Sequence, residues 1–66
     1  MIIKVTRAAD QSIAEQLAEM QRWLDQEGIR ATDLHAVRVL NLRVTYRATF
    51  RNATDANRFV QMFRDG

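Results

Sequence analysis

The 66-residue chain contains no cysteine, no proline, two glycines and one histidine. Without cysteine there is no disulfide to stabilise the fold, and one histidine cannot form the cluster of soft ligands that a structural metal ion needs. Stability must therefore come from packing alone or from a partner subunit. Because glycine is scarce and proline is missing, no linker is visible. We expect a single domain over residues 1–66.

Long apolar runs are also missing. No run approaches the ~18 residues of a membrane span, and the opening MIIKVTRAAD is too short an apolar segment for a signal peptide. We therefore expect a cytoplasmic protein without a membrane partner. The apolar fraction of 47% and the charged fraction of 27% are ordinary for folded domains, so we do not expect disorder.

Side chains that carry catalysis are scarce. Ser12 is the only serine and has the position of a helix cap, and the chain lacks a cysteine nucleophile and a glycine-rich phosphate loop. His35 is alone, and the helix carboxylates Glu15 and Glu19 have no nitrogen or sulfur partner at ligand spacing. We expect no enzymatic activity, no cofactor and no metal ion.

Charge is unevenly divided along the chain. Residues 1–33 carry four basic and six acidic groups, whereas residues 34–66 carry six arginines and two acidic groups. Nine of the ten basic residues are arginine, which favours planar partners such as carboxylates and phosphates. A GC-rich genome produces the same bias, so the bias alone does not indicate a ligand.

Five elements are expected in the order strand, helix, strand, strand, helix. MIIKVT is typical of a strand, with Lys4 and Thr6 on one face. A helix follows and stops at Gly28; Ser12 and Glu15 have the spacing of a capping box for its start, and Asp10 and Thr6 are rival caps one turn or more earlier. Its predicted apolar stripe is Ile13, Leu17, Met20 and Leu24, and its predicted solvent face is Gln16, Glu19, Arg22 and Gln26.

The stretch VTYRATF alternates with period two, which favours a half-buried strand. Upstream the alternation slips within VLNL, and Asn41 tolerates the backbone of a tight turn, so we place a hairpin tip there. The rival interpretation is one bent strand from Leu34 to Phe50. A second helix begins at Asn52 or Thr54. Its apolar face is expected to be Ala56, Phe59, Val60 and Phe63.

This order predicts an α+β fold, with two helices packed on one face of a three-stranded, antiparallel-type sheet. The layout β-α-β-β-α is a truncated split βαβ unit. The third strand would be central. Its apolar residues would lie under the helices and its arginines on the open face.

Arg43, Arg47 and Arg51 are four residues apart, so on a strand they follow one another at about 13 Å, a spacing that suits alternate phosphates of an extended single strand. They are our candidate nucleic-acid contacts. Sheets that recognise RNA specifically present aromatic residues on the open face, whereas Tyr46 and Phe50 have core parity here. An open sheet face must also be polar merely to stay soluble. Single-stranded nucleic-acid binding is therefore the alternative function.

Protein association is the favoured function. We expect a non-catalytic module that binds another protein or a copy of itself, with a homodimer as one form of the latter. Trp23, Val39, Leu40 and Leu42 are the candidate protein contacts. The second strand would leave an open edge for a copy of itself. The competing interpretation is that the slip in alternation buries the hairpin residues under the first helix, and that Trp23 covers the edge of the core.

The segments RWLDQEGI and YRATFRNATDANRFVQMF resemble short uncharacterised bacterial proteins. In these a Trp-Leu helix end precedes a strand that closes on Phe and a helix of the Ala-x-x-Phe type. The resemblance implies a bacterial origin and a strand-helix-strand-strand-helix layout. It implies no activity, substrate or site residue.

Overall fold

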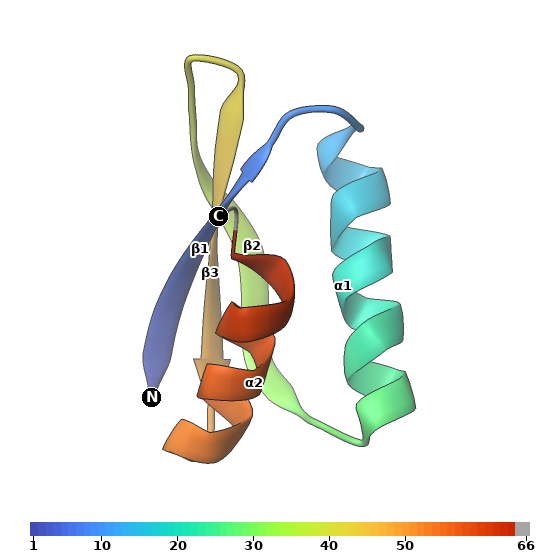
Figure 1. Ribbon diagram of the computed structural model, residues 1–66, viewed down its shortest axis with the longest axis vertical. Helices are drawn as coiled ribbons and strands as arrows, with labels where there is room; N and C mark the ends of the chain where they lie inside the picture. Colours follow the sequence, from blue (N-terminus) through green and yellow to red (C-terminus); the bar gives the residue numbers. More distant parts are fainter. Residues whose placement is uncertain (65–66) are drawn as a thin grey trace.

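The computed structural model describes residues 1–64. The elements are β1 (Ile2–Ala8), α1 (Ile13–Glu27), β2 (Ala31–Leu40), β3 (Arg43–Phe50) and α2 (Ala53–Phe63), as Figure 1 shows. The predicted order of elements and the α+β class are confirmed. In Figure 1, α2 lies in front of the strands and α1 stands to its right.

The sheet has the strand order β1-β3-β2, and both pairs of neighbours are antiparallel. The helix α1 connects β1 to β2, two parallel strands between which β3 inserts, so this is the predicted split βαβ arrangement. The prediction that the third strand is central is confirmed. Both β1 and β2 are edge strands.

Local sequence explains where the helices begin and end. Ser12 caps α1 through a capping box with Glu15, and Gly28 ends it with φ 67°, a conformation that glycine adopts without strain. Asn52 caps α2 by accepting a hydrogen bond from the Asp55 amide. Thr54 is therefore not the cap of α2.

The core lies between the sheet and the helices. Along β3 every second side chain is buried: Val44, Tyr46, Ala48 and Phe50. The helices contribute Met20, Leu24, Ala56, Phe59 and Phe63. The rings of Phe59 and Phe63 are 4.9 Å apart, and the Phe50 ring lies 5.2 Å from Phe59. An aromatic cluster of this kind supplies much of the apolar area in so small a domain.

Two predictions for α1 are wrong. Ile13, expected in the core, is exposed, because as the first residue of the helix it has no preceding turn to shield it. Gln16, expected on the solvent face, is fully buried. It lies one and two helical turns before Met20 and Leu24, in the row that faces the core. Its amide is kept there by hydrogen bonds, which are described below.

The hairpin predicted at Asn41 is confirmed, and one bent strand is excluded. Asn41 and Leu42 form a two-residue turn with φ 53° and 61°. Such values fit a type I′ turn, which asparagine tolerates and leucine rarely adopts. A bulge between Ala36 and Arg38 displaces Val37 from the register. The slip in alternation therefore has two causes, the turn and the bulge.

Candidate interaction surfaces

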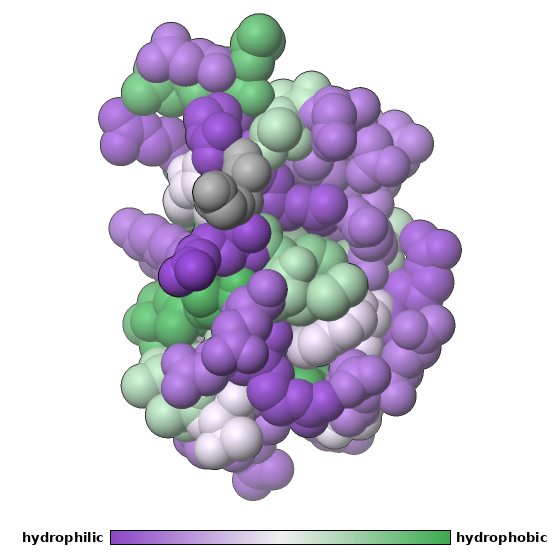
Figure 2. Space-filling model, in the orientation of Figure 1, coloured by the Kyte–Doolittle hydropathy of each residue, from purple (hydrophilic) through white to green (hydrophobic). Residues whose placement is uncertain are grey.

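The outer end of the hairpin carries apolar side chains that are exposed to solvent. Val37, Val39, Leu40 and Leu42, here called the hairpin patch, are exposed to 42, 61, 52 and 83%. The tip rises beyond both helices in Figure 1, and hydrophobic atoms gather at that end of the molecule in Figure 2. The interpretation that these residues are buried under α1 is therefore wrong.

The hairpin patch points to both faces of the ribbon. Val39 is paired with Val44, which places it on the helix side, whereas Leu40 is paired with Arg43 on the open side. A strand pair with apolar residues on both faces is suited to insertion between other elements. The sequence predicted three of these four residues, and Val37 was missed because the bulge breaks its parity.

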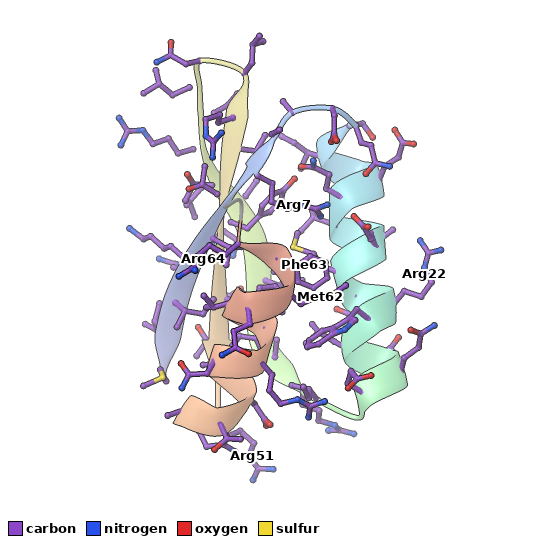
Figure 3. All side chains as sticks on the ribbon, viewed as in Figure 1. Arg7, Arg22, Arg51, Met62, Phe63 and Arg64 are labelled. Carbon is purple, nitrogen blue, oxygen red and sulfur yellow. The ribbon has the colours of Figure 1, made fainter. Side chains whose placement is uncertain are left out.

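The open face of the sheet carries the predicted arginine row. Thr45, Arg47 and Thr49 alternate with the buried residues of β3, so the predicted parity is confirmed. Arg43 lies at the hairpin end of this row. Arg51 follows the last residue of β3, and its side chain extends away from the body at the opposite end of the molecule in Figure 3.

Arg47 takes part in a network across the ladder. Its Nη2 donates to Nε2 of His35 at 3.2 Å and lies 3.6 Å from a carboxylate oxygen of Asp33. Nδ1 of His35 lies 3.0 Å from the other Asp33 oxygen. These contacts fit a neutral imidazole with its proton on Nδ1, donating to Asp33 and accepting from Arg47. The network holds the Arg47 side chain against the sheet.

Two further cations join this face. The register pairs Lys4 with Arg47 and Arg38 with Thr45, and residues directly opposite each other point to the same side of a sheet. Neither residue was predicted from the sequence to lie on this face, because alternation separates the two faces of a strand but does not tell which of them is open. Asp33 is the acidic residue that the register of residues 1–64 places on this face.

Trp23 lies at the boundary between the two helices. Its ring is 5.5 Å from Phe63 and 6.1 Å from Phe59, in edge-to-face geometry, and it is partly buried against the core. Trp23 therefore covers the edge of the core, which is the interpretation that competes with its role as a protein contact. Its remaining surface lines a groove of about 520 Å³ between α1 and α2, together with Met62 and Phe63.

A buried polar contact connects α1 to β3. The Tyr46 hydroxyl donates to Oε1 of Gln16, and Nε2 of Gln16 donates to the Ala8 carbonyl at 2.8 Å and to Asp10 at 3.2 Å. All of the amide's hydrogen-bonding groups are thus satisfied, which offsets the cost of burying it. Burial raises the pKa of the Tyr46 phenol above its ordinary value of 10.0, and the positive charge of Arg7 opposes this rise.

Within residues 1–64, no three His, Asp or Glu side chains gather in a position to hold a metal ion. None of the helices in the same range has the length and apolar character to cross a membrane.

The geometry thus offers three surfaces: an apolar hairpin tip, a basic sheet face and an interhelical groove. Comparison of the chain with protein-family models, with curated proteins and with solved structures found no match.

Proposed function

We propose that this protein is a small non-catalytic module that associates with copies of itself through the β2–β3 hairpin. The observation that carries the proposal is the exposure of the hairpin patch, whose four apolar residues gather at one end of the molecule (Figure 2). Scattered exposed apolar residues are ordinary, but contiguous ones on monomers mark interaction sites. The cytoplasm is its expected compartment.

The tip also departs from the usual chemistry of hairpin turns. Type I′ turns favour glycine after asparagine, yet here Leu42 occupies that position at φ 61°. Leucine adopts this backbone at a cost, and its side chain is 83% exposed, so little burial within the monomer offsets that cost. Burial against a second copy would supply the missing compensation.

Sedimentation velocity from one to several hundred micromolar tests the proposal. We expect concentration-dependent association of the wild type and a monomer for Leu42→Asp, because a carboxylate at the tip cannot be buried without a partner. Ile13→Asp is the matched control, because Ile13 is an exposed apolar residue outside the hairpin. It should associate like the wild type. A wild type that stays monomeric throughout the range contradicts the proposal.

A second candidate function, single-stranded nucleic-acid binding, is favoured by one observation: Lys4 and Arg38 lie on the same face as Arg43 and Arg47. Four cations across three strands form a wider basic surface than the row along β3 alone. Phosphate-backbone binding needs such a surface, and its affinity falls steeply as salt rises. Among residues 1–64, the aromatic rings of β3, Tyr46 and Phe50, are buried on the other side of the sheet, so binding would not depend on sequence.

The test is fluorescence anisotropy with a labelled oligonucleotide at low salt. We expect binding that weakens with added salt and is lost in Arg47→Glu. Because Arg47 also belongs to the network with Asp33, the exposed Arg38→Glu provides a second variant, expected to weaken binding at least tenfold. Arg22→Glu, on the outer side of α1, is the control. An absence of binding at low salt excludes this function.

A further inference from the structure

The groove between α1 and α2 has an apolar floor. Ala18, Trp23, Met62 and Phe63 contribute to its lining, and its volume of about 520 Å³ is large enough for several side chains. In Figure 3 the side chains of Met62 and Phe63 extend from α2 toward α1. Met62 is 57% exposed, so much of this apolar surface is uncovered in the monomer. Methionine and tryptophan are residue types that often anchor partners.

The α1 wall of the groove carries two carboxylates and one guanidinium, and one of the carboxylates, Glu19, is paired with Arg7. Glu15 and Glu19 both line it, and Arg22 is the basic residue of the same wall. Arg22 extends outward from α1 in Figure 3, away from Met62 and Phe63. Glu19 accepts a hydrogen bond from Arg7 at 2.7 Å, yet its side chain is still 47% exposed. A partner with apolar side chains and flanking positive charge would therefore complement this groove.

The hairpin has this chemistry. Leu40 and Leu42 extend from its tip, Val39 lies beside them, and Arg38 and Arg43 flank the apolar residues at the base of the turn. Two hairpins placed tip to tip would instead bring the arginines of both copies together, which is unfavourable. Charge therefore favours contact between the hairpin and the groove over contact between two hairpins.

A chain cannot place its own hairpin in its own groove. The strand β3 is paired with β1 on one side and with β2 on the other, which fixes the direction of the hairpin. The tip rises beyond both helices (Figure 1), whereas the groove is lined by residues of α1 and α2. The occupant must be the hairpin of another molecule.

We infer that the interhelical groove of one copy receives the apolar hairpin tip of a second copy. This inference rests on the proposed function and identifies the surface that the hairpin binds. The two surfaces in contact are different, so the interface is heterologous. One such contact leaves a free hairpin at one end and a free groove at the other, and assembly continues to a ring or an open chain of copies.

Complementation between two defective variants tests this arrangement. Leu42→Asp removes the hairpin's ability to insert and keeps the groove, whereas Met62→Lys places a positive charge in the groove and keeps the hairpin. Each variant alone is expected to be monomeric by sedimentation velocity. An equimolar mixture is expected to form a one-to-one heterodimer and nothing larger, because its outer ends carry the two defects.

Ala18→Lys serves as a second groove variant, since Ala18 is an exposed residue of α1. Circular dichroism and thermal unfolding establish that each variant is folded. Ile2→Lys, on an exposed residue distant from both surfaces, should assemble like the wild type.

The outcomes separate the two proposals. If Leu42→Asp assembles like the wild type, the hairpin is not the contact and the proposed function fails. If Leu42→Asp is monomeric but both groove variants assemble like the wild type, the hairpin binds another surface and the inference about the groove is overturned. A mixture of folded, monomeric variants that forms no heterodimer overturns it as well.

Discussion

Two valines that face each other across the β2–β3 ladder lie in very different surroundings. Val44 is 2% exposed, whereas Val39, its partner in the register and on the same face, is 61% exposed. Val44 belongs to the central strand and has Arg7 of β1 on its other side. Val39 belongs to an edge strand, at the end that the helices do not reach. Position within the sheet, and not residue type, determines burial here.

The same contrast divides β2 along its length. From Ala31 to Ala36 most side chains are partly buried, and from Val37 to Leu40 all are exposed, although the second part is the more apolar. The bulge before Arg38 marks the boundary. The inner end of the ribbon holds the fold together, and the outer end has apolar surface that the fold does not use.

The largest expected effect is at the inner end. Phe50→Ala should lower the free energy of unfolding by about 3–5 kcal/mol, because it removes a buried ring from the aromatic cluster. Leu40→Ala, at the outer end, should change it by less than about 0.5 kcal/mol. Urea unfolding followed by Trp23 fluorescence, at a concentration where the chain is monomeric, measures both. If Phe50→Ala and Leu40→Ala lowered the free energy of unfolding equally, the two ends of the ribbon would not differ in this way.

The two valines give a closer comparison. Val44→Ala should cost about 2 kcal/mol, because it removes two buried methyl groups. Val39→Ala should cost less than about 0.5 kcal/mol in the monomer. The same unfolding experiment applies, and a costly Val39→Ala at low protein concentration would contradict the exposure of the hairpin patch.

Tyr46→Phe should cost about 1–3 kcal/mol, because it leaves the buried Gln16 oxygen without its donor. Burial raises the folded-state pKa of this phenol, so the folded chain holds the proton more tightly than the unfolded chain. The stability that the protonated phenol contributes is therefore complete below about pH 10, and it is lost as the pH rises through the pKa of the phenol in the folded state.

Thermal unfolding between about pH 8 and about pH 11, a range that includes the phenol's ordinary pKa of 10.0, measures this dependence. The variant should be less stable than the wild type at pH 8 and should lose less stability at higher pH. Tyr46 is the only tyrosine of the chain, and the difference between the two pH curves therefore reports this one phenol. If the stability of the wild type and of Tyr46→Phe fell in parallel with pH, the assignment of this pH dependence to Tyr46 would be contradicted.

The smallest effect is at the tip. Leu42→Gly should raise the free energy of unfolding of the monomer by about 0.5–1 kcal/mol, because glycine adopts the positive φ of this turn without strain. It should also weaken self-association, because the apolar side chain is gone. Chemical denaturation and sedimentation measure the two quantities separately. If Leu42→Gly raised both the free energy of unfolding and the strength of self-association, there would be no functional reason for leucine at this position.

Much of the fold was predictable because its signals are local. The period of two along β3, the capping box at Ser12 and the glycine at Gly28 each depend on neighbouring residues. Gln16 was mispredicted because the hydroxyl that makes its burial tolerable belongs to Tyr46, thirty residues later in the chain. Only its spacing from Met20 could have indicated that it faces the core.

The candidate surfaces were less predictable. The arginine row follows from alternation, but the addition of Lys4 and Arg38 depends on the register between strands. Likewise, the sequence marks Leu42 as apolar, and only the length of the hairpin relative to the helices leaves it exposed. Surfaces formed by elements distant in sequence need the assembled structure.

The strand order β1-β3-β2 also has a kinetic consequence. Pairs between β2 and β3 join residues near each other in the chain, such as Leu40 and Arg43, whereas Ile2 at the start of β1 pairs with Thr49. Closing the shorter loop costs less entropy, so the hairpin is expected to form before β1 docks. During that interval the central strand is itself an edge, and the newly made chain is most open to mispairing then.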